Sequence, residues 1–255
     1  MSAPATARKV DARVTRFGIL AHSSEGAALC FREFCRSGFR EAQHMHPDVM
    51  LDCEAIGHVM PAWDAGDHAT VRAFFERAVQ RLADGGCDFF ACPDNTAHIA
   101  LETEGSDLAL PGLNIGDVVA EHAAGTGMTR VAVLGTRFTM GGPVYRRALP
   151  AVGIEPVFPN DEERADIDRI IFDELVEGQF TATSRDRYVE IMDRLKQDEG
   201  CDGVALVCTE IPLLVTPDVS PLPILDSTRL LARAAYEVCT GKRAFPNWRG
   251  GPVHG

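Results

Sequence analysis

Two short segments of the chain carry side chains that could move a proton, and both begin with Gly-Cys-Asp. The first, GCDFFACPDNTAH, contains Cys92 and Asp94, and the second, GCDGVALVCTE, contains Cys208. Counted from the shared beginning, Asp94 occupies the position of Cys208, whereas Cys92 falls opposite Leu206. The comparison therefore selects Asp94 and Cys208 as the pair that could do chemistry, and it indicates that Cys92 is a core thiol.

The repetition extends to a second pair of segments, TRFGILAHSS from Thr15 and TRVAVLGTRF from Thr129. Both pairs are the same number of positions apart, which indicates a duplicated unit. Short apolar runs alternate with helical patterns, an order typical of parallel strands covered by helices. We therefore expect an α/β fold of two pseudo-symmetric, doubly wound parallel-sheet lobes. Sites in such sheets lie at the carboxyl ends of the strands, so Asp94 and Cys208 would face each other across the cleft between the lobes.

A carboxyl group and a thiol on opposite sides of a cleft suit proton removal on one face of a planar intermediate and proton return on the other. The reference pKa is about 8.5 for a thiol and about 3.9 for an aspartate, a difference of about 6 kcal/mol in proton affinity. An aspartate is therefore the weaker base unless its surroundings favour the protonated form. If Asp94 is held protonated, Cys208 as a thiolate could abstract a proton and Asp94 could return one. Asp94 could instead cap the helix that follows it.

Four motifs resemble the aspartate/glutamate racemase superfamily, and most closely its aspartate-racemase branch. They are PDNTAH, where the family has Pro-Cys-Asn-Thr-Ala-His, and LGTRFTM, DEERADIDRIIFDELVEGQ and CTEIPLL. The likeness runs from about Phe17 to Thr240. It implies a cofactor-independent and usually dimeric enzyme with two pseudo-symmetric α/β lobes, in which two cysteines take turns as base and acid at the substrate Cα.

Carried over by motif, the second catalytic cysteine is Cys208, and Asp94 stands at the position of the first. The resemblance also implies a set of residues that hold the substrate carboxylate and amine: Ser24, Asn95, Thr96, Thr136, Thr139 and Thr209. His98 and Glu210 match supporting residues that follow the two catalytic positions. Aspartate racemases often carry a lysine near residue 179, where this chain has Gln179.

The expected organisation is discontinuous in sequence. We expect a disordered leader over residues 1–14 and a first α/β lobe over 15–117 plus 223–245. The second lobe would comprise residues 118–222, and residues 246–255 would form a C-terminal tail.

Composition and motif searches narrow the possible partners. A net charge of −12 over 255 residues argues against binding to nucleic acid. No apolar run reaches the roughly 18 residues that a membrane span requires. Eight cysteines without a signal peptide favour a cytoplasmic location. The HMHPD segment lacks a third metal ligand, and GTGMTR precedes a strand instead of following one. We expect no metal, no cofactor, no nucleic acid and no membrane contact, but a small carboxylate or amino-acid substrate and, from the resemblance, a homodimer.

The leading functional prediction is a cofactor-independent racemase or epimerase that transfers protons at the α-carbon of an amino acid or related small carboxylate. The alternatives are a decarboxylase or lyase, or a cis-trans isomerase of a small dicarboxylate, using Cys208. A catalytically inactive homologue that binds an amino acid is a further alternative.

Overall fold

The protein is described by a computed structural model over residues 15–42 and 44–253. Its strands are β1 (Phe17–Ala21), β2 (Val49–Cys53), β3 (Phe89–Ala91), β4 (Gly112–Leu113), β5 (Arg130–Leu134), β6 (Glu155–Val157), β7 (Gly203–Leu206) and β8 (Ile224–Asp226). The expected leader, residues 1–14, lies outside the described residues, as do the last two residues of the expected tail.

Helices connect these strands. The longer ones are α1 (Ser24–Glu41), α3 (His68–Asp84), α5 (Ile115–Gly125), α7 (Pro143–Ala151), α8 (Asp161–Ile170), α9 (Ala182–Gln197) and α11 (Ser227–Cys239). The short ones are η1 (Ile56–His58), α2 (Met60–Asp64), α4 (Ala97–Leu101), α6 (Arg137–Gly141), the π-helical η2 (Ile171–Leu175) and α10 (Ile211–Leu214). Among the described residues, no helix combines the length and apolar character that a membrane crossing requires.

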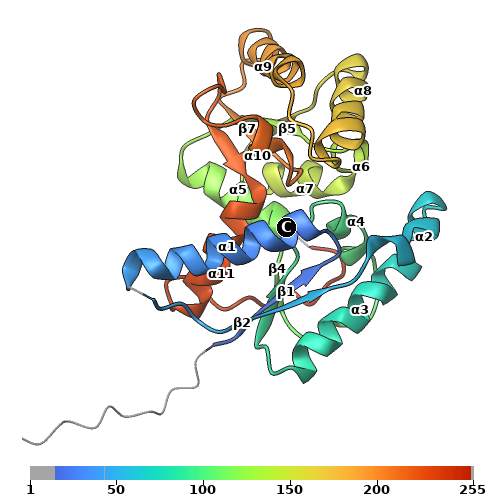
Figure 1. The fold of residues 1–255 in the computed structure, drawn as a ribbon, viewed down its shortest axis with the longest axis vertical. Helices are drawn as coiled ribbons and strands as arrows, with labels where there is room; N and C mark the ends of the chain where they lie inside the picture. The colour runs from blue at the N-terminus through green and yellow to red at the C-terminus, as the bar shows by residue number, and fades with distance from the viewer. Residues whose placement is uncertain (1–14, 43, 254–255) are drawn as a thin grey trace, which may run out of the picture.

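The strands form two parallel four-stranded sheets, and each sheet builds one lobe (Figure 1). The strand order is β2-β1-β3-β4 in the first sheet and β6-β5-β7-β8 in the second. The two orders are equivalent, since β1 corresponds to β5 and β3 to β7. This confirms the predicted α/β fold with two similar lobes. Because β3 and β7 hold the same place in their sheets, the residues that follow them reach corresponding ends of the two lobes.

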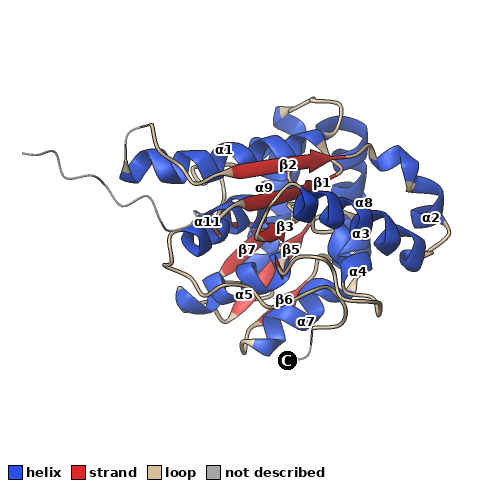
Figure 2. Ribbon diagram, turned by 90° about the horizontal axis from the view of Figure 1, so that it is seen from below, coloured by secondary structure: helices blue, strands red, loops and turns tan. Residues whose placement is uncertain are grey.

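Alternate residues of each strand enter different cores, as the two-residue period of a strand requires. Phe17 and Ile19 face a central core, whereas Leu20 faces a second core with α3. The central core also contains Val131 and Val133 of β5, packed with side chains of α1, α5, α7 and α11. A third core lies under α8 and α9, on the other side of the second sheet. The central core is therefore continuous through both lobes. Figure 2 shows the strands of both sheets and their covering helices from below.

The pairing of the last strand differs from the expected division of the chain. β8 pairs in parallel with β7 and so completes the second sheet, whereas residues 223–245 were expected in the first lobe. The helix that follows, α11, packs against α1 and α5. The chain therefore leaves the second sheet at Asp226, which caps α11 by accepting a hydrogen bond from the Arg229 N–H. The expected boundary between residues 117 and 118 lies inside α5.

The C-terminal segment packs on the first lobe. The N–H of Gly112 in β4 donates to the Trp248 carbonyl (2.7 Å), and the Leu108 N–H donates to the Arg249 carbonyl (2.8 Å). The Trp248 ring lies against Phe90 of β3, with ring centroids 6.2 Å apart. This segment therefore continues the first lobe instead of standing apart from it.

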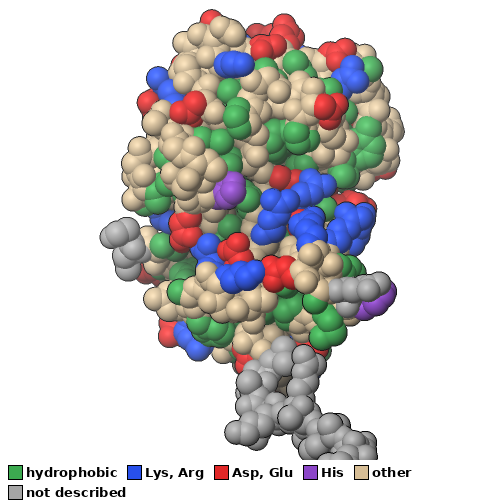
Figure 3. Space-filling model, turned by 90° about the vertical axis from the view of Figure 1, so that its left-hand side faces the viewer, with side chains coloured by type: hydrophobic (Ala, Val, Ile, Leu, Met, Phe, Trp, Pro, Cys, Tyr) green, Lys and Arg blue, Asp and Glu red, His purple; other side chains and the backbone are tan. Residues whose placement is uncertain are grey.

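One side of the molecule carries basic side chains beside acidic ones (Figure 3). Where α1 and α11 meet, Glu33 accepts hydrogen bonds from Arg40 and Arg233, each 3.0 Å long. Lys242 and Glu41 form a further ion pair in this region. The basic groups in these pairs are partly neutralised by their neighbours.

Candidate active site

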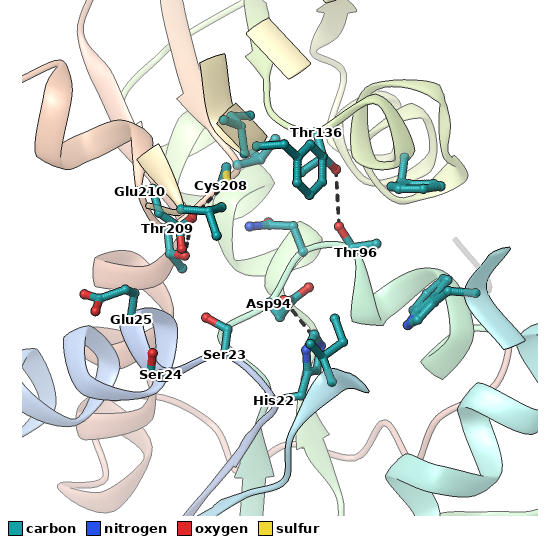
Figure 4. A pocket seen from close by; sticks show the side chains of 18 of the residues that line it. His22, Ser23, Ser24, Glu25, Asp94, Thr96, Thr136, Cys208, Thr209 and Glu210 are labelled. Atoms are coloured by element: carbon teal, nitrogen blue, oxygen red, sulfur yellow. Dashed lines mark hydrogen bonds and ion pairs between the residues drawn. The ribbon is translucent and has the colours of Figure 1, made fainter. Parts of the chain in front are cut away.

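A cavity of about 440 Å³ lies between the carboxyl ends of the strands of the two lobes (Figure 4). Its polar lining comes from the turns after β1, β3, β5 and β7: His22, Ser23, Ser24, Glu25, Asp94, Asn95, Thr96, Thr136, Cys208, Thr209 and Glu210. Apolar side chains from η1, α2, α6 and η2 complete the lining. The predicted pair, Asp94 and Cys208, is thus brought to one cavity from two lobes. The other predicted residues that line it are Ser24, Asn95, Thr96, Thr136, Thr209 and Glu210.

The two carboxylate oxygens of Asp94 have different partners. Oδ1 accepts a hydrogen bond from the Ala97 N–H (2.9 Å), so Asp94 satisfies the first N–H of α4 as a capping side chain does, although Thr96 holds the N-cap position. Oδ2 lies 3.3 Å from Nε2 of His22, the distance of an ion pair when the ring is protonated. The capping role and a role in the cavity therefore coexist, because each uses a different oxygen.

His22 is a residue that sequence reasoning missed. It is 5% exposed, it follows β1, and its ring stacks on Phe75 with centroids 5.4 Å apart. The offset that relates Asp94 to Cys208 also relates His22 to Thr136, a residue that was predicted. The internal repeat therefore held the signal that could have identified His22.

The Cys208 thiol faces acidic neighbours. Its Sγ donates to Oε2 of Glu210 (3.0 Å), which also accepts from the Thr209 hydroxyl (2.7 Å). Burial, followed by the Glu210 carboxylate and by Asp94, raises the pKa of the Cys208 thiol well above its usual range. Cys208 therefore holds its proton at neutral pH, which favours a proton donor over a resting thiolate.

His98 supports Asp94 from behind the cavity. Its ring is fully buried, and burial lowers its pKa, so the ring is neutral. Nε2 accepts from the Ile115 N–H (3.2 Å), which leaves Nδ1 to donate to the Asp94 carbonyl (2.8 Å). The Trp248 ring stacks on this imidazole with centroids 5.9 Å apart and planes 14° apart. His98 therefore positions the Asp94 backbone without lining the cavity.

Three threonine hydroxyls join the lobes beside the cavity. Thr96 Oγ1 lies 3.3 Å from Thr136 Oγ1 and 3.1 Å from Thr139 Oγ1, and the two latter hydroxyls are 3.2 Å apart. Thr96 and Thr136 line the cavity, whereas Thr139 is 1% exposed and lies behind them. The cluster can turn hydroxyl groups toward a carboxylate in the cavity.

The two remaining predicted residues have other contacts. Both polar atoms of the Asn95 side chain are bonded within the protein: Oδ1 accepts from the Tyr145 hydroxyl (2.6 Å) and Nδ2 donates to Ser227 Oγ (3.0 Å). Ser24 is the first residue of α1 and lies exposed at the cavity, while its neighbour Ser23 caps the helix by accepting from the Gly26 N–H (3.2 Å). Asn95 therefore ties the two lobes together.

Two other features noted in the sequence do not join the site. Cys92 is fully buried in the core with α3, and burial raises the pKa of its thiol. No group of three or more His, Cys, Asp or Glu side chains in the described ranges could hold a metal ion.

Comparison with known proteins agrees with this geometry. The family model for Asp/Glu/Hydantoin racemase matches residues 64–235. The broad specificity amino-acid racemase RacX of Bacillus subtilis (strain 168) is 24% identical over 177 residues, covering 66% of this chain and 72% of that protein. The fold is similar to a crystal structure from Yersinia pestis described as a candidate Asp/Glu racemase (TM-score 0.79, 27% identity). That likeness covers 89% of this chain and 99% of the other. An aspartate racemase homologue from Pyrococcus horikoshii OT3 gives a TM-score of 0.73 at 25% identity, with the same coverage.

Proposed function

Because the chain belongs to the Asp/Glu/Hydantoin racemase family, we propose that it racemises an amino acid by proton transfer at the α-carbon, with Asp94 and Cys208 as the catalytic residues. The observation that carries this proposal is that both residues line one cavity from equivalent strands of the two lobes. The reaction needs no cofactor when one group removes the Cα proton and another returns a proton on the opposite face.

The assignment of the two roles follows from the Cys208 thiol. Because its pKa is raised, Cys208 carries the proton that is delivered, and Asp94 is the group that receives the Cα proton. This is the opposite of the direction expected from the sequence, in which Cys208 was the thiolate. After one turnover Asp94 is protonated and Cys208 is a thiolate, so the same pair can carry the other enantiomer back.

The carbanion requires hydrogen-bond donors that are already in place. The hydroxyls of Thr96, Thr136 and Thr209 are suitable donors, with Thr139 behind them and Ser24 at the rim. Asn95 would contribute by holding the lobes at a fixed separation, since its side chain is bonded to Tyr145 and Ser227.

Exchange in D₂O tests the proposal. The enzyme should replace the Cα proton of an amino-acid substrate with deuterium and produce the opposite enantiomer, measured by proton NMR and chiral chromatography. Cys208→Ala and Asp94→Asn should each lower both rates at least a hundredfold. Cys53→Ala is the matched control, because Cys53 is an exposed thiol outside the cavity lining. Gas or olefin release without exchange would point to the lyase alternative, and binding without exchange would point to an inactive homologue.

We also propose that the enzyme is a cytoplasmic homodimer. Exposed Phe31 (40%) and Phe39 (49%) both lie on α1 and support an interface there, because aromatic residues are enriched at subunit contacts. Light scattering of the purified protein should give twice the 27.7 kDa mass of one chain.

A further inference from the structure

Apolar side chains form the wall of the cavity that faces solvent. Ile56 and Met60 come from the first lobe, and Phe172 and Val176 come from the second; they are 38%, 38%, 46% and 55% exposed. More deeply placed apolar residues stand beside them: Trp63, Phe138 and Ile171. Large apolar side chains that remain exposed around one opening mark a binding site for an apolar group.

The charges in the lining are all of one sign, apart from the buried ring of His22. Glu25, Asp94 and Glu210 contribute carboxylates, and within residues 15–42 and 44–253 no Lys or Arg lines the cavity. Arg137 lies just outside it, where its guanidinium pairs with Asp168 (3.2 Å) and lies over the Phe138 ring, 4.7 Å from the centroid. Gln179, at the position where aspartate racemases often have a lysine, is also outside the lining.

These two observations decide against an acidic substrate side chain. A second carboxylate on the substrate would enter a cavity that offers it carboxylates and apolar surface but no cation, so its desolvation would be uncompensated. An apolar side chain would instead cover the exposed wall, and a cavity of about 440 Å³ has room for a bulky one.

We infer that the substrates are neutral amino acids with bulky apolar side chains, such as leucine, methionine or phenylalanine, instead of aspartate or glutamate. This inference rests on the proposed racemase function of the same cavity. Ile56, Met60, Phe172 and Val176 are the residues that select the side chain, whereas Asp94 and Cys208 act at the α-carbon.

The test compares Cα deuterium exchange for L-leucine, L-methionine, L-phenylalanine, L-aspartate and L-glutamate. We expect kcat/KM for the three apolar amino acids to exceed that for the two acidic ones at least tenfold. Equal or faster exchange of aspartate or glutamate would overturn the inference and leave the racemase function standing. Absence of exchange with every amino acid would overturn the racemase function and, with it, the inference.

Two variants test whether the apolar wall of the cavity selects the substrate side chain. Phe172→Ala should lower kcat/KM for leucine and phenylalanine at least tenfold, mainly through KM. Phe180→Ala is the matched control, since Phe180 is equally exposed (46%) but lies outside the cavity lining, and its rates should stay within twofold. Equal effects of the two substitutions would overturn the assignment of Phe172.

Discussion

The Glu210 carboxylate adds to the effect of burial in holding the proton on Cys208, and its removal should change the reactivity of the thiol measurably. Glu210→Gln keeps the shape of the side chain and its ability to accept a hydrogen bond, but it removes the charge 3.0 Å from Sγ. Burial still raises the pKa of the thiol in this variant, while the smaller contribution of the Glu210 charge is lost. We therefore expect the Cys208 thiolate to become more populated and alkylation to become faster.

The size of the effect follows from electrostatics. Two unit charges about 4 Å apart interact by about 4 kcal/mol at an effective dielectric constant of about 20. Contact of the thiol with solvent in the cavity reduces this to roughly half. A more acidic thiol is also a weaker nucleophile, and this offsets about half of the logarithmic gain in thiolate. About 1 kcal/mol remains, which corresponds to an increase in alkylation rate of about fivefold.

The assay is iodoacetamide labelling at pH 7.5, followed for each cysteine peptide by mass spectrometry. Exposed Cys53 serves as the internal reference for reagent activity. Glu25→Gln is the matched control, because Glu25 also lines the cavity but makes no hydrogen bond to Cys208 among the described contacts. An unchanged or slower rate at Cys208 in Glu210→Gln would refute the role of Glu210 in holding the thiol protonated.

Other predictions concern the scaffold. Tyr145→Phe leaves the buried amide oxygen of Asn95 without its 2.6 Å donor, so the free energy of unfolding in urea should fall by about 1–3 kcal/mol. Gly26→Ala would place a Cβ 2.9 Å from a backbone carbonyl oxygen of the β3–α4 turn, so both stability and Cα exchange should decrease; Gly125→Ala, which meets no atom within 4 Å, should be neutral. Burial raises the pKa of Glu33, but hydrogen bonds from two arginines outweigh it, and the net pKa lies below the ordinary value of 4.5. Its contribution to stability is therefore complete above that pH and is lost as the pH falls through the lower, folded-state value, a loss that Glu33→Gln should reduce in unfolding curves from pH 7 to pH 3.

Three results would contradict these predictions. The first is an unchanged urea midpoint for the Tyr145 variant, and the second is equal behaviour of the two glycine variants. The third is a Glu33 variant that loses stability in acid as steeply as the natural protein does.

The internal repeat made the two similar lobes and the meeting of Asp94 and Cys208 at one cavity predictable. Because Asp94 and Cys208 stand at the same distance from a shared Gly-Cys-Asp, equivalent strands carry them to one cavity. The apolar wall was not predictable in this way. Met60 and Phe172 come from short helical segments without a clear period, and the fold alone brings them together.

The hydrogen-bond partners of Asn95 could not be predicted from the sequence. The family resemblance implied that Asn95 holds the substrate, and this role stays a prediction. Its bonds to Tyr145 and Ser227, which lie 50 and 132 positions away in the sequence, were not predicted. A motif identifies which side chain is present at a strand end, whereas its hydrogen-bond partners depend on how distant segments pack. The same reason explains why His22 was missed, since its neighbour Asp94 belongs to another strand.

The central core that runs through both lobes has a consequence for how substrate enters the cavity and product leaves it. Swinging the lobes apart would expose that core and break the buried bonds of Asn95, so a wide hinge motion is energetically unfavourable. Displacement of η1–α2 and η2 would expose less of that core, because their side chains Ile56, Met60 and Phe172 are already partly exposed beside the cavity. Turnover would then be limited by the local motion of η1–α2 and η2. A cross-link between these two segments should trap the bound molecule in the cavity.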